Sequence, residues 1–448
     1  MKLNCFSKAL AISTVGILSL SPLGLAAQSL TELYEAARGN DAAFTSARSV
    51  LDANMARAGQ LAGSIAPNIA ATANVSKTEY HVRPDGAKKL SQNRSFVTEN
   101  GAIVVTQPIY RPEAWASYRQ ADPVERQAAA QYEAAEQDLL VRVAQAYFDA
   151  LTSEDTLSYV QAQKKATEEQ LLVARRSFEV GTDTISGVRE AQARLALIEA
   201  QEISATSDVQ SRRLTLRLIT GVANAQPKRV VEGGLVDQPA ESLEVWVDRA
   251  IDNHPALRNA KLSLEIASLE VSKASAGHKP TVDAQLNLSA IRNINGNASY
   301  TQSNTITNPS AAIVFRMPIF DGMTTTNQVR EAVAMESKAR SDQEGVRRRV
   351  EQAANSAYLD LKAGFGQVRA YEAARAASEL ALDANRISYT LGVRVNSDVL
   401  NSQSQLYQSK RDLAKARHDV LVGHLKLRQA AGVLNPADLV AIERLLVP

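Results

Sequence analysis

Apolar and polar residues alternate along two neighbouring stretches in the second half of the chain. Alternation is strict over 282–290, and Ala311, Ile313, Phe315, Met317 and Ile319 share one parity. A weaker version of the same pattern occupies two stretches in the first half, separated by a polar loop with Pro84, Asp85 and Gly86. A period of two is typical of β-strands with one apolar face. The pattern predicts four strands, at about 69–80, 96–109, 281–292 and 310–319.

Two long tracts have helical spacing instead. Prolines are absent between Pro123 and Pro227 and between Pro318 and Pro436, and both tracts are rich in strong helix formers. Leu139, Leu140 and Val143 begin an i, i+3, i+4, i+7 series. Long helices are predicted, with outgoing arms of about 85 Å over 124–180 and about 100 Å over 324–391. On periodicity alone, an ordinary helical bundle remains an alternative.

Each tract is interrupted once, at matching places. Gly181 and Gly392 follow apolar residues and suit the left-handed conformation that ends a helix. Ser186 in the first tract, and Asn396 or Ser397 in the second, are candidate N-caps for a returning helix. Each tract is therefore expected to form a helical hairpin, with turns near 181 and 392.

The two halves of the chain repeat each other. Pro67 matches Pro280 at an offset of about 213 positions, and the segment 102–110 matches 312–320. We expect two repeats, 28–230 and 242–435, joined by a linker over 231–241 and followed by a C-terminal tail over 436–448. Each repeat contains a helix, two strands and a helical hairpin.

Four strands are too few to close a barrel, which needs about eight. Because an open sheet edge cannot be left in lipid, several copies of the chain are expected to pool their strands. No apolar stretch after the N-terminal one has the ~18 residues that a spanning helix needs. The predicted fold class is an α+β membrane protein, with long α-helical hairpins forming an α-barrel tunnel and four strands per chain contributing to a shared β-barrel.

The N-terminus has the features of a secretory signal peptide. Lys2 and Lys8 precede an apolar run, and small residues follow at Ala26 and Ala27. We expect residues 1–27 to be removed on export; an uncleaved membrane anchor is the alternative. Cys5, the single cysteine, lies before the apolar run, so no disulfide is expected in the mature chain.

Composition and motifs argue against several function classes. The net charge of +2, with basic residues interleaved among acidic ones, does not favour nucleic-acid binding. The five histidines are scattered and form no metal-binding motif, and no phosphate-binding loop or nucleophile elbow is present. We expect no enzyme activity, no metal and no cofactor.

In its motifs and their order, the chain resembles the TolC family of outer-membrane efflux proteins. The marks are the strand ends at 107–110 and 318–322, the segments 146–149 and 357–360, the turns at Gly181 and Gly392, and the stretches 157–164 and 432–439. The resemblance covers the whole mature chain. It implies a homotrimer with a twelve-stranded outer-membrane barrel, a periplasmic α-helical tunnel and a belt around its middle, assigned to 222–242 and the C-terminal tail. It further implies a duct of a tripartite efflux or type I secretion system, docked on a periplasmic adaptor and an inner-membrane ABC or RND transporter.

The resemblance also assigns roles at the hairpin tips. It places Tyr389, Arg394, Asp398 and Asn401 at the pore constriction, and Gly181, Gly392, Ser186 and Ser397 at the adaptor contact. Relatives often carry two acidic rings one helical turn apart, which attract cations. Here the second position is Asn401, which implies weaker cation binding. The position that accepts a bond from the tyrosine in relatives is Gly187 here, and Ser186 is a substitute acceptor.

Two other readings compete with the duct. A soluble periplasmic coiled-coil adaptor would lack the duplicated strand pairs, and an exported enzyme would need a catalytic constellation. Asp398 also has a simpler reading, as an acidic residue that stabilises the start of a helix. The transported substrate, drug or protein, is not readable from the sequence.

Overall fold

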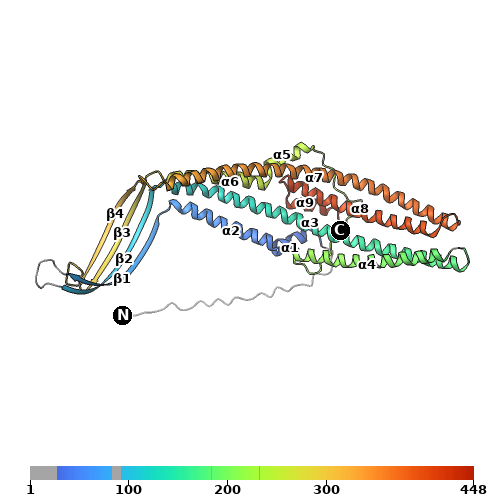
Figure 1. Cartoon of the computed structure of the whole chain (residues 1–448), viewed down its shortest axis with the longest axis horizontal. Helices are drawn as coiled ribbons and strands as arrows, with labels where there is room; N and C mark the ends of the chain where they lie inside the picture. The colour runs from blue at the N-terminus through green and yellow to red at the C-terminus, as the bar shows by residue number, and fades with distance from the viewer. Residues whose placement is uncertain (1–27, 83–91, 183, 232, 448) are drawn as a thin grey trace.

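The chain folds into an elongated rod of helices with a β-sheet extending from one end (Figure 1). This is a computed structural model, and it describes residues 28–82, 92–182, 184–231 and 233–447. The expected signal peptide and the Pro84-Asp85-Gly86 loop lie outside the described residues. None of the described helices has a stretch long and apolar enough to cross a membrane.

The element order repeats, as predicted. The first repeat contains α1 (Leu30–Asn40), α2 (Ala42–Ala62), the short η1 (Gly63–Ile65), β1 (Asn68–Val82), β2 (Gln92–Tyr110), α3 (Pro112–Glu179) and α4 (Ile185–Thr220). The second contains α5 (Leu243–Asn253), α6 (Pro255–Ala276), β3 (Thr281–Ile294), β4 (Asn304–Arg316), α7 (Thr324–Thr390) and α8 (Asn396–Ala430), and is followed by α9 (Pro436–Glu443). The predicted fold class, long helical hairpins with four strands in two repeats, is confirmed.

The four strands form one antiparallel sheet in the order β1-β2-β3-β4. The central pair, β2 and β3, joins the two repeats, with a register shift between Pro108 and Tyr110. Polar side chains are buried on one face, where Asn293 hydrogen-bonds Thr98 (3.1 Å) and Asn304 (2.7 Å). The opposite face carries apolar side chains, among them Ile103, Leu286 and Leu288. β4 ends at Arg316, short of the stretch to 319 that the alternation suggested, because Pro318 has no N–H to extend a ladder.

Helix α3 begins earlier than its proline content suggested. The outgoing arm was expected to start after Pro123, but α3 starts at Pro112 and contains Pro123 in its interior. That expectation is wrong, because neighbouring helices hold this part of α3 in place. Gln120 donates hydrogen bonds to the Ile266 carbonyl (3.4 Å) and Glu270 (2.9 Å) of α6, and Gln127 donates to Ser263 (2.7 Å). Pro at the first helical position, as at Pro112, costs little.

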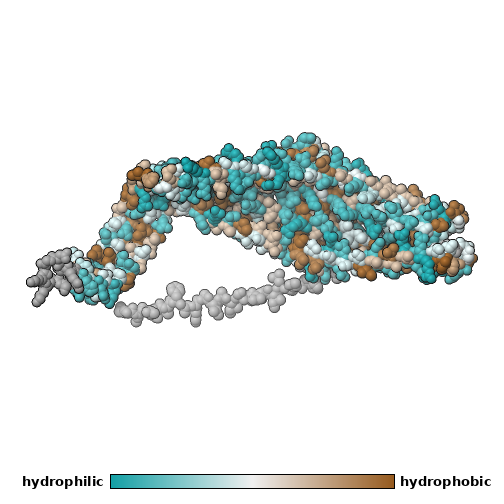
Figure 2. Space-filling model, viewed as in Figure 1, coloured by the Kyte–Doolittle hydropathy of each residue, from teal (hydrophilic) through white to brown (hydrophobic). Residues whose placement is uncertain are grey.

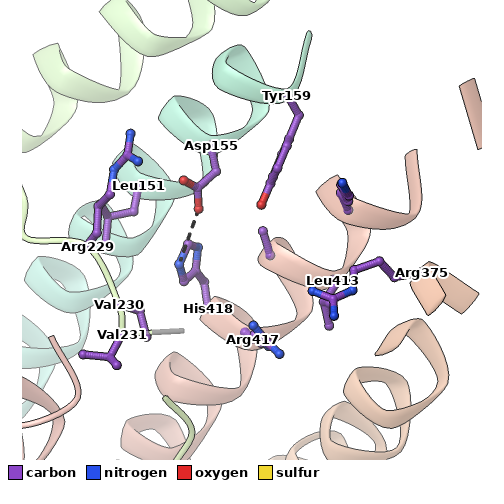
Figure 3. A pocket seen from close by; sticks show the side chains of 12 residues that line it. Leu151, Asp155, Tyr159, Arg229, Val230, Val231, Arg375, Leu413, Arg417 and His418 are labelled. Atoms are coloured by element: carbon purple, nitrogen blue, oxygen red, sulfur yellow. Dashed lines mark ion pairs between the residues drawn. The ribbon is translucent and has the colours of Figure 1, made fainter. Parts of the chain in front are cut away.

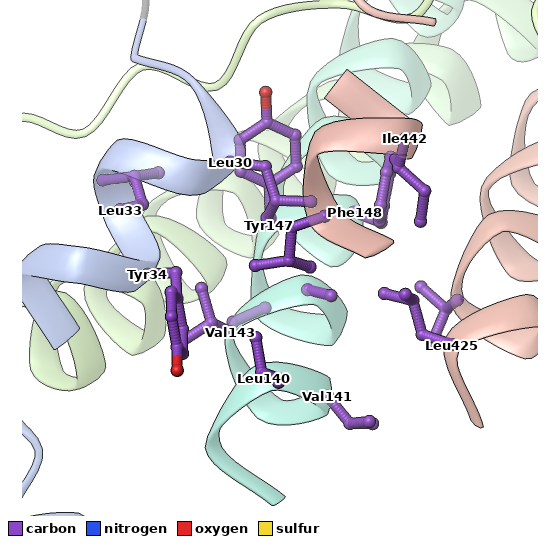
Figure 4. Packing of buried hydrophobic residues seen from close by; sticks show 14 of the residues in the cluster. Leu30, Leu33, Tyr34, Leu140, Val141, Val143, Tyr147, Phe148, Leu425 and Ile442 are labelled. Carbon is purple, nitrogen blue, oxygen red and sulfur yellow. The ribbon is translucent and has the colours of Figure 1, made fainter. Parts of the chain in front are cut away.

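The largest hydrophobic core lies midway along the rod, where helices of both repeats and the C-terminal helix meet (Figure 4). We call it the waist cluster, and its largest fully buried members include Leu30, Tyr34, Leu140, Tyr147 and Phe148. Helix α1 enters it through a capping box in which Ser29 accepts from the Glu32 amide and Glu32 accepts from the Ser29 amide.

Polar contacts tie the surrounding segments to the waist cluster. Arg142 donates two hydrogen bonds to Asp41, at 2.7 and 3.0 Å, and this holds the pKa of the Asp41 carboxyl below its ordinary value. The Tyr147 hydroxyl donates to the Lys228 carbonyl at 3.0 Å. Leu446 of the C-terminal tail forms an isolated bridge with Val230. The segment after α4 and the chain's end therefore pack together around the rod's middle.

Candidate functional site

The two hairpin tips lie together at the end of the rod away from the sheet (Figure 1). Gly181 and Gly392 have φ angles of +78° and +72°, the left-handed region that glycine adopts without strain. Their backbone hydrogen bonds match: the Gly181 amide donates to the Phe178 carbonyl and the Gly392 amide to the Tyr389 carbonyl, both at 3.0 Å. The amide of the following residue donates to the Ser177 carbonyl in the first turn (2.8 Å) and to the Ser388 carbonyl in the second (2.9 Å). Both turns thus end their helices by the same Schellman-type geometry.

The returning helices begin differently from the expected N-caps. Thr184, and not Ser186, caps α4, with its hydroxyl accepting from the Gly187 amide at 3.4 Å. Helix α8 starts at Asn396 after Val395, and no side chain caps it, so the expectation for Asn396 or Ser397 is wrong. The reason is that the Asn396 side chain is used elsewhere. It accepts from Gln170 at 2.6 Å and donates to the Gly187 carbonyl at 3.3 Å.

Asn396 therefore links the two hairpins close to their tips. It is buried, like three further polar residues where α3 meets α8. Gln403 donates to the Gln163 carbonyl and to the Thr167 hydroxyl, both at 3.4 Å. We call Gln163, Thr167, Asn396 and Gln403 the polar seam. Buried polar groups need partners, so the seam fixes the axial alignment of one hairpin against the other. Sequence reasoning missed it, because glutamine on a long helix reads as a surface residue.

Of the four residues assigned to the constriction, Tyr389 lies at the end of α7, Arg394 in the turn, and Asp398 and Asn401 at the start of α8. Asp398 pairs with Arg394 at 3.3 Å, and both side chains are partly exposed. Asn401 accepts a hydrogen bond from Arg194 of α4 at 2.7 Å, a second link between the hairpins. Tyr389 packs against a small cluster with Leu382, Val399 and Leu406.

Exposed apolar side chains surround these polar groups at the tips. Val180, Leu391, Val393 and Val395 are each more than half exposed. Figure 2 shows hydrophobic surface at the tips and on the sheet, with mostly hydrophilic surface over the helices between them. The sheet contributes Ile69, Val75, Ile313 and Phe315, which are equally exposed. The described chain thus presents apolar surface at its two ends.

A cavity of about 350 Å³ lies near the rod's middle, between α3, α7 and α8, under the segment that follows α4 (Figure 3). Four cationic side chains and one carboxylate line it: Arg229, Arg375, Lys410, Arg417 and Asp155. Arg417 and Lys410 are paired with Glu372 (2.7 Å) and Glu379 (4.0 Å). This lining suits a small anion better than a metal cation. Within the described part of the chain, no group of His, Cys, Asp or Glu side chains converges in a metal-binding arrangement.

His418 closes one wall of the cavity. Thr152 donates to the Phe148 carbonyl (2.7 Å), so its oxygen accepts from Nδ1–H of His418 at 2.8 Å. The other ring nitrogen, Nε2, then faces Asp155 at 3.9 Å without a proton. Burial lowers the pKa of His418 to about 4. Burial also raises the pKa of the Asp155 carboxyl, against the opposing charge of Arg229.

Comparison with known proteins identifies this architecture. The family model described as outer membrane efflux protein matches residues 33–222 and 246–433. The outer membrane protein TolC of Vibrio cholerae is 30% identical over 421 residues, covering 93% of each chain. The protease secretion protein PrtF of Dickeya chrysanthemi is 26% identical over 440 residues, covering 96% of this chain and 94% of that one.

Solved structures share the fold at lower identity. The outer membrane protein VceC of Vibrio cholerae superposes with a TM-score of 0.76 at 17% identity, covering 90% of this chain and 96% of that one. The CmeC outer membrane channel of Campylobacter jejuni gives 0.77 at 13% identity, covering 100% and 98%. At such identities the likeness shows the fold alone.

Proposed function

Because the chain belongs to the outer membrane efflux protein family and is an outer-membrane exit duct for efflux or type I secretion, we propose that three copies assemble into one continuous conduit. Their four-stranded sheets would join into a twelve-stranded barrel in the lipid, and their hairpins into a periplasmic tunnel. The observation that carries this proposal is the sheet itself. Its apolar face is uncovered in the single chain, its polar face is turned the other way, and β1 and β4 each have one open edge.

Lipid suits the apolar face, and the polar face suits a water-filled bore. The hairpins carry the bore away from the membrane, since α3 alone, with 68 residues, is about 100 Å long. The conduit acts passively and catalyses no reaction; the relatives it matches are channels and secretion proteins. The belt around the middle is assigned to 222–242, which includes the linker 231–241 between the repeats 28–230 and 242–435, and to the tail 436–448 that follows the second repeat.

The tips are the proposed docking surface for a periplasmic adaptor, which connects the duct to an inner-membrane ABC or RND transporter. Gly181, Gly392, Ser186 and Ser397 lie there, among apolar side chains that stay exposed in the single chain. Two relatives are named for protease secretion, PrtF and AprF of Pseudomonas aeruginosa, and one from Brucella suis is named an efflux protein. Both kinds of cargo fit a duct whose selectivity comes from its transporter.

Asp398, Asn401, Tyr389 and Arg394 form the proposed constriction at the closed end of the tunnel. Three copies of Asp398 would form a ring of carboxylates, which attracts cations and obstructs the bore. The pairing of Asp398 with Arg394 offsets part of that charge. The partner of Asn401 is Arg194, so this second position adds no negative charge to the ring.

Single-channel recording in planar bilayers tests the constriction with opposite substitutions. Asp398→Ala removes the ring and is expected to raise conductance and weaken block by a multivalent cation. Asn401→Asp adds a second ring one turn along the helix and is expected to strengthen that block. If neither variant changes conductance or block, Asp398 only stabilises the start of α8.

The assembly itself is tested by extracting the protein from outer membranes and running it unheated on an SDS gel. The expected product is a heat-sensitive oligomer of three chains. A monomer recovered from the soluble periplasmic fraction would contradict the duct.

A further inference from the structure

The cationic side chains that line the cavity near the rod's middle are not all neutralised by neighbours. Arg417 is paired with Glu372, and Lys410 with Glu379. Arg375 is different: within the described residues its side chain has neither an ion-pair partner nor a hydrogen-bond partner, although its Nε–H is buried. Buried donors in folded proteins almost always have an acceptor, which can be an ion or an ordered water. Arg375 therefore has N–H groups for an acceptor from outside the chain.

Donors from three helices converge on this cavity. Figure 3 shows Arg375 reaching from α7 toward Arg417 of α8, with the Tyr159 hydroxyl of α3 turned toward the same space. Burial raises the pKa of Tyr159, and the charges of Arg417, Arg375 and Arg229 oppose that rise. Three guanidinium groups thus lie close enough to act on one hydroxyl. Arg417 donates to Glu372 at 2.7 Å through one of its five N–H groups, so donors remain there as well.

Apolar side chains form much of the remaining wall. Leu151, Val230, Val231 and Leu413 line the cavity together with the charged groups. Hydrogen bonds between a charged donor and an anion are stronger where apolar neighbours lower the local dielectric. The volume of about 350 Å³ is many times the roughly 30 Å³ that one water molecule occupies in the liquid. A small ion therefore fits together with several waters.

We propose that this cavity binds one small tetrahedral oxyanion, phosphate or sulfate, held by Arg375 together with Arg417, Lys410 and Tyr159. A guanidinium presents two parallel N–H groups that match two oxygens of such an ion. The other oxygens of a tetrahedral ion are available to donors on the remaining walls, which come from α3 and α8. Asp155 opposes the binding of an anion, but the four cationic side chains outnumber it.

The position of the cavity identifies the source of this ion. Asp155 lies about 65 Å along α3 from Pro112, where the helix begins next to the sheet. The phosphate groups of lipids around the sheet are therefore out of reach. The ligand is a free ion of the surrounding solution.

The bound ion connects segments that are far apart in the sequence. Arg375 and Arg417 belong to the second hairpin, Tyr159 belongs to the first, and Arg229 lies in the segment that follows α4. These groups meet only in the folded chain. Because the ion binds the folded chain alone, it stabilises that arrangement of the two hairpins.

Equilibrium dialysis with radiolabelled inorganic phosphate tests the site on the mature protein purified in detergent, with chloride keeping the ionic strength constant. Wild type should bind one phosphate per chain in a saturable manner, and unlabelled sulfate should displace it. Arg375→Gln removes the guanidinium and should weaken binding at least about tenfold. Arg348→Gln is the matched control, at an arginine of the same helix whose side chain is 75% exposed, and should bind as wild type does.

Asp155→Asn tests the same site in the opposite direction. It removes a negative charge from the wall, so phosphate should bind at least about twofold more tightly. Absence of saturable binding to wild type overturns the proposal, and so does unchanged affinity in Arg375→Gln. If circular dichroism shows that Arg375→Gln does not fold, unchanged affinity in Asp155→Asn overturns it instead. Each result holds whether the protein is a monomer or a trimer, so the proposed conduit is tested separately.

Discussion

The waist cluster and the hairpin tips are built from the same long helices, yet they bury their apolar residues to opposite degrees. At the waist, Leu140 is 0% exposed among residues from both repeats and from α9. At the tips, Leu391 is 72% exposed beside Gly392. The core of one chain is therefore concentrated at the middle of the rod.

The contrast separates what a single chain can stabilise from what the assembly must supply. Hydrophobic stabilisation scales with the apolar area removed from water, so the waist cluster dominates the stability of the single chain. The tips are held by two short turns, the polar seam and small apolar clusters such as that of Tyr389 with Val399, whereas the apolar side chains of the turns themselves are left exposed for other copies or a partner protein. A substitution at the waist should damage folding, whereas the equivalent substitution at a tip should damage assembly or docking.

The largest difference between the waist cluster and the tips is expected for a matched pair of leucine truncations. Leu140→Ala opens a cavity in the waist cluster and is expected to lower the free energy of unfolding by about 2–5 kcal/mol. Leu391→Ala removes an exposed side chain and is expected to change it by less than about 0.5 kcal/mol. Guanidinium unfolding followed by circular dichroism measures both. Equal shifts in the two variants would mean that the waist is not the centre of stability.

Much of this contrast was predictable from the sequence. The proline-free tracts and the helical spacing of Leu139, Leu140 and Val143 predicted the long helices, and Gly181 and Gly392 predicted the turns. These signals are local, because backbone conformation and side-chain period depend on neighbouring residues. The alternating strands were visible for the same reason.

What the sequence did not reveal depends on contacts between distant segments. Pro123 looked like a helix boundary, but packing against α6 overrides the cost of an interior proline. Asn396 looked like an N-cap, but its side chain reaches Gln170 across the seam between the hairpins. The cavity beside His418 brings together residues from three helices and a loop, which no local pattern indicates.

A second pair of variants compares two glycines with nearly the same backbone. Gly432, two residues before Leu434 of the waist cluster, has φ +70°, and an added Cβ would lie 2.5 Å from His254 Cα. Gly392 has φ +72°, with nothing within 4 Å of an added Cβ. Alanine at Gly392 should cost only the left-handed strain, about 1–2 kcal/mol. Alanine at Gly432 should cost about 1–3 kcal/mol more, because backbone atoms must move.

The same unfolding measurement decides between the two contributions. If Gly432→Ala and Gly392→Ala are destabilised equally, backbone strain accounts for both, and the close approach of Gly432 to His254 has no energetic weight. A larger loss at Gly432 assigns the difference to packing at the waist.

A weaker effect is expected in how stability depends on pH, and it comes from His418, which packs against Phe148 of the waist cluster. Buried His418 has a pKa of about 4 in the folded chain, below its ordinary value of 6.5, so the unfolded chain takes up a proton first as the pH falls. Stability is therefore lost on acidification, by about 1 kcal/mol between pH 7.5 and 5.5. Burial also lowers the pKa of His254 and His424, whereas Asp155, with a raised pKa, acts in the opposite direction.

The difference between wild type and His418→Asn isolates this residue from those other groups. Asparagine can keep a hydrogen bond to Thr152 but does not titrate, so the variant should lose about 1 kcal/mol less than wild type over the same pH range. His278→Asn, at an exposed histidine, is the matched control for replacing a histidine outside the core. Parallel curves for wild type and His418→Asn would show that His418 changes its protonation at the same pH in the folded and unfolded chains. In that case burial near the waist cluster would not affect the protonation of His418, and the contrast with the tips would rest on apolar packing alone.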